Sequence, residues 1–169
     1  MPTKKTRINT KPPYNNNADL AVKYICQWHY DRNLIDEATD ESQTKKLFEE
    51  FIELVAANMP DATPKEIATK VINMVKELYA DNRIKTVPAG QELAAKKDAL
   101  GDMNVVMINI IERNQWTFYE TLMCSYNEIK DRKGIALNGT FIKAVDLPAY
   151  KAEIENAGFN YDQVIEDNT

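Results

Sequence analysis

Cysteine, histidine and long apolar runs are scarce in this 169-residue chain. The single histidine, His29, argues against a zinc cluster, and the apolar helical surroundings of Cys26 and Cys124 predict reduced core residues, not a disulfide. The longest apolar stretch, residues 103–111, is interrupted by two asparagines and is far shorter than the roughly 20 residues that cross a bilayer. The polar N-terminus lacks the apolar segment of a signal peptide. These absences predict a cytoplasmic protein with no membrane partner.

The formal net charge of −5 argues against a general nucleic-acid-binding surface. The length, with 44% hydrophobic and 28% charged residues, predicts one globular domain with a substantial core. Prolines and asparagines in residues 1–17 predict a flexible arm, and residues 147–169 predict a short last helix followed by a loose acidic end.

Apolar residues at helical spacing predict five helices, over residues 18–32, 41–58, 64–79, 91–113 and 118–133. The capping boxes Thr63–Glu66 and Thr117–Glu120 mark the starts of the third and fifth. The fourth is apolar enough to predict a nearly buried helix, and Asn138-Gly139 between two short apolar runs predicts a β-hairpin. The fold class is therefore all-α, a bundle of about five helices with a small C-terminal hairpin.

Carboxylates interrupt the apolar stripes of the second and fourth predicted helices. Glu50 and Glu53 are three residues apart, and Asp98 and Asp102 are four apart, so each pair lies on one helix face. If the two helices face each other, four carboxylates converge, and such a cluster needs a cation to offset its repulsion. Ligands that are all oxygen favour Mg²⁺ or Mn²⁺. The alternative is that these acids line a solvated helix face.

Cationic side chains near the end of the fifth predicted helix suit a phosphate ligand. Lys130, Arg132 and Lys133, with Asn127 one turn earlier, would clamp a triphosphate, and Lys46 lies beside the first acidic run. The alternative for the basic turn is a helix end whose cations complement the helix dipole, and both roles can coexist.

Several polar or aromatic residues have two interpretations. Trp28 either stacks on a base or ribose or belongs to the core, and His29 either donates to a phosphate or fills an aromatic corner. Arg32 is the better phosphate candidate because it stays charged. Asn104 and Asn109 are polar residues in an apolar helix, so they either contact substrate or form hydrogen bonds between neighbouring helices. For Asn109 we favour the link between helices.

Five pieces of sequence occur in an informative order. They are Trp-His-x-x-Arg-Asn-Leu-Ile at 28–35, Glu-Glu-x-x-Glu at 49–53, the acidic helix at 98–103, Asn-Glu-Ile-Lys-Asp-Arg-Lys-Gly at 127–134, and Asn-Gly-Thr-Phe-Ile-Lys at 138–143. Over residues 20 to 146, this order resembles the phage-type members of the MazG-like all-α nucleoside triphosphate pyrophosphohydrolases.

The resemblance implies Mg²⁺-dependent hydrolysis of a nucleoside triphosphate, often a deoxynucleotide such as dGTP or dCTP, to the monophosphate and pyrophosphate. Glu50, Glu53 and Asp102 match the metal ligands of the family, with Mn²⁺ as a possible substitute for Mg²⁺. Glu49 matches the glutamate that orients or deprotonates the attacking water. The resemblance also implies a homodimer or homotetramer, and for a phage protein the host cytoplasm.

The chain departs from the family at two places within its predicted catalytic domain, residues 18–146. The family's second motif is usually Glu-x-x-Asp, but Ala99 occupies the glutamate position, which leaves Asp98 as the substitute ligand. The two acidic motifs are also further apart than usual, by about the length of an inserted helix and loop at 63–90. That insertion would cap the pocket or enlarge an oligomer interface.

Two other functions remain open from the sequence. A non-enzymatic helical interaction protein would have the same helices with their acids on a solvated face. An enzyme of the same type would instead act on a nucleoside diphosphate or another pyrophosphate-linked small molecule.

Overall fold

The structure is a computed structural model that describes residues 18–169, and it is all-α as the sequence predicts. The predicted flexible arm, residues 1–17, lies outside the described residues. The five long helices are α1 (Ala18–Asp31), α3 (Asp40–Ala57), α4 (Pro64–Ala80), α5 (Glu92–Arg113) and α6 (Phe118–Ile129). The remaining elements are α2 (Leu34–Glu37), β1 (Gly134–Leu137), β2 (Thr140–Lys143), the 3₁₀-helix η1 (Ala144–Tyr150), α7 (Lys151–Asn156) and α8 (Tyr161–Asp167).

Capping boxes begin three of the long helices. The predicted boxes of α4 and α6 are confirmed, because the Thr63 and Thr117 hydroxyls accept from backbone N–H groups three residues later. Hydrogen bonds from Thr63 lower the pKa of Glu66, since they favour its ionised form. A third box, between Thr39 and Ser42, begins α3.

The predicted hairpin is also confirmed. β1 and β2 pair antiparallel, with Ile135 opposite Ile142 and Leu137 opposite Thr140. Asn138 and Gly139 both adopt positive φ, at 48° and 77°, as a two-residue hairpin turn requires. β1 begins at Gly134, so the hairpin directly follows the basic turn at residues 130–133.

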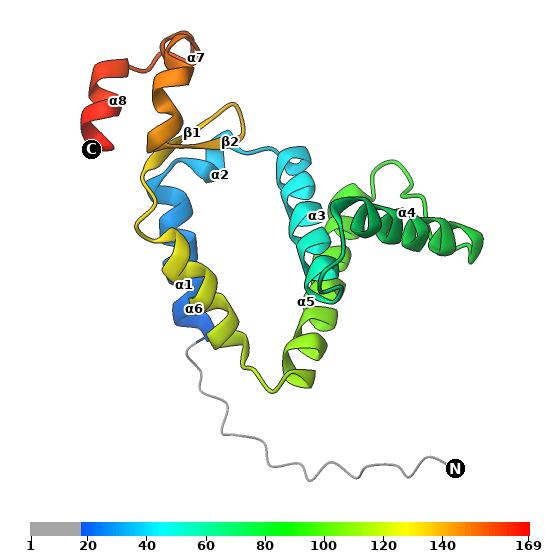
Figure 1. Cartoon of the computed structure of the whole chain (residues 1–169). Helices are drawn as coiled ribbons and strands as arrows, with labels where there is room; N and C mark the ends of the chain where they lie inside the picture. Colours follow the sequence, from blue (N-terminus) through cyan, green and yellow to red (C-terminus); the bar gives the residue numbers. More distant parts are fainter. Residues whose placement is uncertain (1–17) are drawn as a thin grey trace, which may run out of the picture.

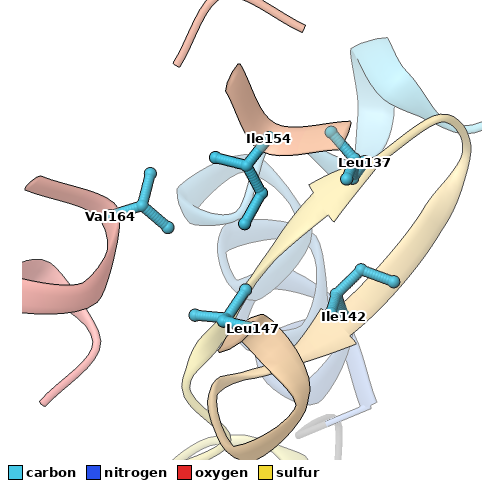
Figure 2. Packing of buried hydrophobic residues seen from close by; sticks show 5 residues of the cluster. All are labelled: Leu137, Ile142, Leu147, Ile154 and Val164. Atoms are coloured by element: carbon cyan, nitrogen blue, oxygen red, sulfur yellow. The ribbon is translucent and has the colours of Figure 1, made fainter. Parts of the chain in front are cut away.

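The C-terminal segments form a compact core on one face of this hairpin (Figure 2). Leu147 of η1 and Ile154 of α7 are fully buried there, and Val164 of α8 closes the cluster. The prediction of a loose acidic end is therefore wrong. α8 is held by this apolar contact and by the Asn168 side chain, whose Oδ1 accepts from the Gly134 N–H at 2.6 Å.

A second core joins the first helices to the hairpin. It contains the buried residues Trp28, Leu34 and Ala136, with Phe141 packed against the indole ring. α1 lies alongside α6, where Tyr24 stacks on Tyr126 with ring centroids 5.4 Å apart. This pairing brings the end of α1 next to the basic turn.

The α3–α5 part of the molecule is far more open. Figure 1 shows α3, α4 and α5 on one side and the α1–α6 pair on the other, with connections at the top and bottom of the view. α3 and α5 have no buried residue, and α4 has only Val71. The prediction that residues 91–113 form a nearly buried helix is wrong, because α5 fully buries none of its residues against its neighbours in the described chain.

The expectation of core cysteines is also wrong. Cys26 and Cys124 are both free thiols, as predicted, but both are exposed. Their helices α1 and α6 bury other positions against each other, and helical spacing alone does not determine which apolar positions face inward.

We expect Gly134→Ala to destabilise the protein strongly. Gly134 has φ +150°, and an added Cβ would lie 2.1 Å from the carbonyl oxygen of Ile142. The backbone conformation alone would cost about 1–3 kcal/mol, before the clash is counted. Thermal unfolding measures this loss, with the exposed neighbour Lys133→Ala as the control. An unchanged melting temperature for Gly134→Ala would contradict this geometry.

Candidate metal and phosphate site

The first acidic group lies on the exposed surface of α3. Glu49, Glu50 and Glu53 are all exposed, and Glu49 and Glu50 share one cationic partner. The Lys46 Nζ lies 3.1 Å from an oxygen of each carboxylate. Hydrogen bonds to Glu49 and then to Glu50 raise the pKa of Lys46, so the amine is positively charged at neutral pH.

The second acidic group lies on the outward face of α5. Asp98 and Asp102 are exposed, and at 3.6 residues per turn they share a face with Val105 and Val106. These two valines are 67% and 59% exposed, more than the apolar residues Met103 and Met107 at 37% and 40% on the opposite side. The acid pair of α5 is therefore directed away from the rest of the chain.

An ion pair joins the starts of the two helices. Lys96 of α5 contacts Asp40, the first residue of α3, and both helices lead away from this contact toward the bottom of Figure 1. Asp102 follows Lys96 by roughly 9 Å along α5, whereas Glu50 follows Asp40 by roughly 15 Å along α3. The two acidic groups are therefore staggered.

The predicted four-carboxylate cluster is not assembled within one chain. Among residues 18–169, no three Asp, Glu, His or Cys side chains come close enough to hold a metal ion. The donor set is chemically suitable for Mg²⁺, since all its atoms are carboxylate oxygens. Its members, Glu50 and Glu53 on α3 and Asp98 and Asp102 on α5, do not meet in this arrangement.

Glu53 also borders an apolar groove between α3 and α4. The groove has a volume of about 540 Å³ and is lined mainly by aliphatic and aromatic side chains, among them Phe48, Ile52 and Ile72. Lys76 is the cation in its lining. α4 thus lies directly beside the first acidic motif.

The basic turn is accessible at the end of α6. Asn127, Lys130, Arg132 and Lys133 are all exposed, and the Arg132 guanidinium lies 3.9 Å from Glu128 one turn earlier. In Figure 1 the end of α6 belongs to the α1–α6 side of the molecule, away from α3 and α5. The single chain therefore does not place these cations next to the acidic groups.

The structure assigns structural contacts to Trp28 and Arg32. Trp28 is only 8% exposed, and its indole N–H donates to the carbonyl of Ile129 at 2.7 Å. The Arg32 guanidinium lies over the indole ring and donates to the carbonyls of Lys130 and Arg132, at 3.2 and 2.8 Å. Burial lowers the pKa of Arg32. Trp28 is thus a core residue with no face free for a base. Arg32 hydrogen-bonds to the backbone of the basic turn, a structural role different from the phosphate contact that the sequence predicted.

The other polar candidates have local roles. His29 packs edge-on against Trp28, with its Nδ1 2.8 Å from the carbonyl oxygen of Ile25. Asn104 donates to the Leu100 carbonyl one turn earlier in its own helix. Asn109 is exposed on the acid-bearing face of α5. The aromatic-corner interpretation of His29 is the one these contacts favour.

Two features of the site were not found from the sequence. The Asp40–Lys96 ion pair joins residues 56 positions apart, and no spacing rule links them. Lys76 and Glu53 both line the α3–α4 groove, because α4 packs on α3. Hydrophobic patterning predicted α4 but not the direction in which this helix packs.

The chain is similar to a protein of Haemophilus phage HP1 described as an "Uncharacterized 18.2 kDa protein in rep-hol intergenic region". The two are 44% identical over 63 residues, which is 34% of this chain and 39% of the phage protein's length. No protein-family model matches the chain. No solved structure matches it either. No helix within residues 18–169 combines the length and apolarity needed to cross a membrane.

We expect Lys130→Ala and Arg132→Ala to impair the use of a nucleoside triphosphate while changing thermal stability little. Both side chains are exposed, and each would contribute only about 0.3–1 kcal/mol through the helix dipole. A charge-assisted contact to phosphate is worth roughly 1.5–3 kcal/mol, so kcat/KM should fall about 10-fold or more. The Arg132 change should be the more damaging, because a planar guanidinium can hold two phosphate oxygens.

Steady-state kinetics with parallel melting curves test this expectation, and Lys151→Ala serves as a control because it removes an exposed cation from α7. Unchanged kinetics with a large fall in melting temperature would make the turn a structural cap.

Proposed function

We propose that the protein is a Mg²⁺-dependent nucleoside triphosphate pyrophosphohydrolase that forms a nucleoside monophosphate and pyrophosphate. The observation that carries this proposal is the pair of acidic motifs on two helices whose acid-bearing faces are exposed to the outside. The order of these motifs relative to residues 28–35, 127–134 and 138–143 resembles one family of such hydrolases. The apolar side chains exposed around these carboxylates on α3 and α5 support the proposal, because a large uncovered apolar surface marks a binding or interaction site.

The residues divide the chemistry between two groups. Glu50, Glu53, Asp98 and Asp102 supply the oxygen ligands for Mg²⁺, which neutralises triphosphate charge and activates water when bound. Glu49 orients or deprotonates the attacking water. Its present partner is Lys46, an amine that is able to exchange this exposed ion pair for a contact with phosphate.

The basic turn completes phosphate recognition in this proposal. Lys130, Arg132 and Lys133 bind the triphosphate, and Asn127 donates or accepts one hydrogen bond from the same helix end. Arg32 contributes indirectly, because its hydrogen bonds to the carbonyls of Lys130 and Arg132 hold the shape of this turn. The Trp28 ring packs against the Arg32 guanidinium, whose Cζ lies 4.5 Å from the ring centroid.

The substrate class is a deoxynucleoside triphosphate, with dGTP and dCTP as first choices. The setting is the host cytoplasm during phage infection, which similarity to a phage HP1 protein supports. The test is a panel of all ribo- and deoxyribonucleoside triphosphates with Mg²⁺, separated by ion-exchange chromatography. Monophosphate plus pyrophosphate supports the proposal, whereas diphosphate plus phosphate, or no turnover, contradicts it.

A helical interaction protein without enzymatic activity is the second candidate. The specific observation in its favour is the uncovered apolar surface of α3, α4 and α5. A thermal-shift titration separates the two candidates. Millimolar Mg²⁺ or Mn²⁺ should raise the melting temperature of an enzyme with a carboxylate site, but a solvated acidic face should respond weakly.

We expect Asp98→Ala to weaken the response to Mg²⁺, because Asp98 replaces the glutamate that the family carries one position later. Asp98 and Asp102 share one face of α5, and an exposed Ala99 leaves room for a longer side chain. Adding Ala99→Glu to Asp98→Ala should therefore restore part of the activity, and Ala99→Glu alone should be tolerated. Mg²⁺ titrations of the activity measure each variant. If Asp98→Ala shows the same Mg²⁺ dependence as the wild type, Asp98 is not a metal ligand and the site has only three protein carboxylates.

A further inference from the structure

The base of a bound nucleotide needs a partner other than Trp28. The indole ring of Trp28 is only 8% exposed, because it packs against Phe141 and lies under the Arg32 guanidinium. A nucleoside triphosphate whose phosphates lie at the α3 carboxylates must therefore place its base on another surface near α3. Sites for small molecules are mostly apolar pockets with a few polar groups that fix the orientation of the ligand.

The groove between α3 and α4 is such a pocket, and it adjoins the α3 carboxylates. Its volume of about 540 Å³ lies within the range of about 300–1,000 Å³ that small-molecule sites occupy. Glu53 belongs both to the lining of this groove and to the proposed metal ligands, and Glu49 precedes it by one turn on the same helix. A ligand in the groove is therefore continuous with phosphates held at the metal.

The lining of the groove suits a flat, uncharged aromatic group. Phe48 is 48% exposed, and Ile72 and Val75 on α4 are 54% and 46% exposed, so these side chains are accessible to a ligand. Every nucleobase has a π face that can stack on an aromatic ring. A phosphate would meet a wall that is almost wholly apolar, so the base end of the nucleotide is the end that fits.

Lys76 supplies the groove with a hydrogen-bond donor. It is exposed, and it has no ion-pair partner within residues 18–169. An ammonium group only donates hydrogen bonds. Guanine presents two neighbouring acceptors, N7 and O6, whereas adenine and cytosine each present an amino donor on the corresponding edge. A lysine in the groove therefore favours guanine over these two bases.

We propose that the α3–α4 groove is the nucleobase subsite of the enzyme, with Phe48 stacking on the base and Lys76 selecting guanine. This inference rests on the proposed function, and it makes dGTP a better substrate than dCTP. α4 lies within residues 63–90, the stretch by which the chain exceeds the motif spacing of the family that it resembles. The subsite is therefore not one that the resemblance implies.

The selectivity is tested by measuring kcat/KM for the four deoxynucleoside triphosphates. Lys76→Ala should lower the value for dGTP about 10-fold and leave the values for dATP and dCTP nearly unchanged, because only guanine loses its donor. Lys70→Ala is the matched control, since it removes an exposed cation of α4 that is not part of the groove lining. An equal fall for all four nucleotides, or an unchanged preference for dGTP, would overturn the role of Lys76.

The groove itself is tested by calorimetric binding of the α,β-methylene analogue of dGTP with Mg²⁺, which requires no turnover. Ile72→Trp fills the groove at an exposed position and should weaken this binding at least 10-fold, while binding of inorganic triphosphate, which has no base, stays unchanged. The control Asn73→Trp adds the same ring at an exposed position outside the groove lining and should bind the analogue as the wild type does.

Equal binding of the analogue to the wild type and to Ile72→Trp, or no binding to either, would overturn the inference. Equal binding would assign the groove to contact with another protein chain. If Ile72→Trp does not fold, the base preference of Lys76→Ala still decides. A wild type that binds the analogue through the groove but hydrolyses no nucleoside triphosphate would contradict the proposed function and retain the subsite.

Discussion

Glu50→Gln and Asp102→Asn should each abolish turnover while leaving a folded helical protein. Each change removes one ligand charge but keeps the shape of the side chain, and both positions are exposed, so folding does not depend on them. A metal ion contributes several kcal/mol of charge stabilisation in the transition state, so losing it should lower kcat/KM by at least 100- to 1,000-fold. Initial rates at saturating Mg²⁺ measure this effect.

The melting temperature without metal is the control measurement for these two variants. Removing one of several acidic groups relieves repulsion on α3 or α5, so the melting temperature without metal should stay the same or rise. The surface pair between Lys46 and Glu50 contributes at most a few tenths of a kcal/mol against this. Most of the wild-type activity remaining in either variant would show that the metal assignment is wrong.

Trp28→Ala should cause the largest loss of stability of any single change discussed for this protein. The indole is buried between α1 and the hairpin, packs against Phe141, and supports Arg32. Truncating a buried tryptophan costs about 3–5 kcal/mol, and the carbonyl of Ile129 would lose one of its two donors, keeping the Arg132 backbone N–H. Urea unfolding monitored by circular dichroism measures the change.

Trp28→Phe distinguishes a core role from base stacking. It keeps an aromatic ring but removes the N–H, so it should cost about 1–3 kcal/mol of stability. Because the indole has no face free for a nucleotide, the KM of the folded variant should equal that of the wild type. A KM raised 10-fold at a temperature where the variant is fully folded would show that Trp28 contacts the nucleotide and would contradict its assignment to the core.

Local sequence signals predicted the secondary structure well. The Thr63 and Thr117 capping boxes and the Asn138-Gly139 turn involve residues within three positions of one another, so sequence alone contains all the groups that interact. The final helix α8 was missed because its stability depends on Val164 packing against η1 and α7. Its seven residues would not form a stable helix alone.

Burial and long-range contacts were much less predictable. Helical periodicity identifies an apolar face but not the element that covers it, which is why α5 and both cysteines were expected in the core. Arg32 was assigned to phosphate because its acceptors, the carbonyls of Lys130 and Arg132, lie about 100 residues away. The candidate site has the same difficulty. Its two acidic motifs were found by spacing, but their meeting depends on how helices and subunits pack.

The most direct test of the proposed function is hydrolysis of dGTP and dCTP in ¹⁸O-labelled water with Mg²⁺, followed by ³¹P nuclear magnetic resonance. Water attack at the α-phosphorus predicts monophosphate that carries the label and pyrophosphate that does not. EDTA should stop the reaction, and Glu50→Gln should not form labelled product. Label in inorganic phosphate with diphosphate as the other product, or no product from any nucleoside triphosphate, would contradict the proposal that this chain is a pyrophosphohydrolase.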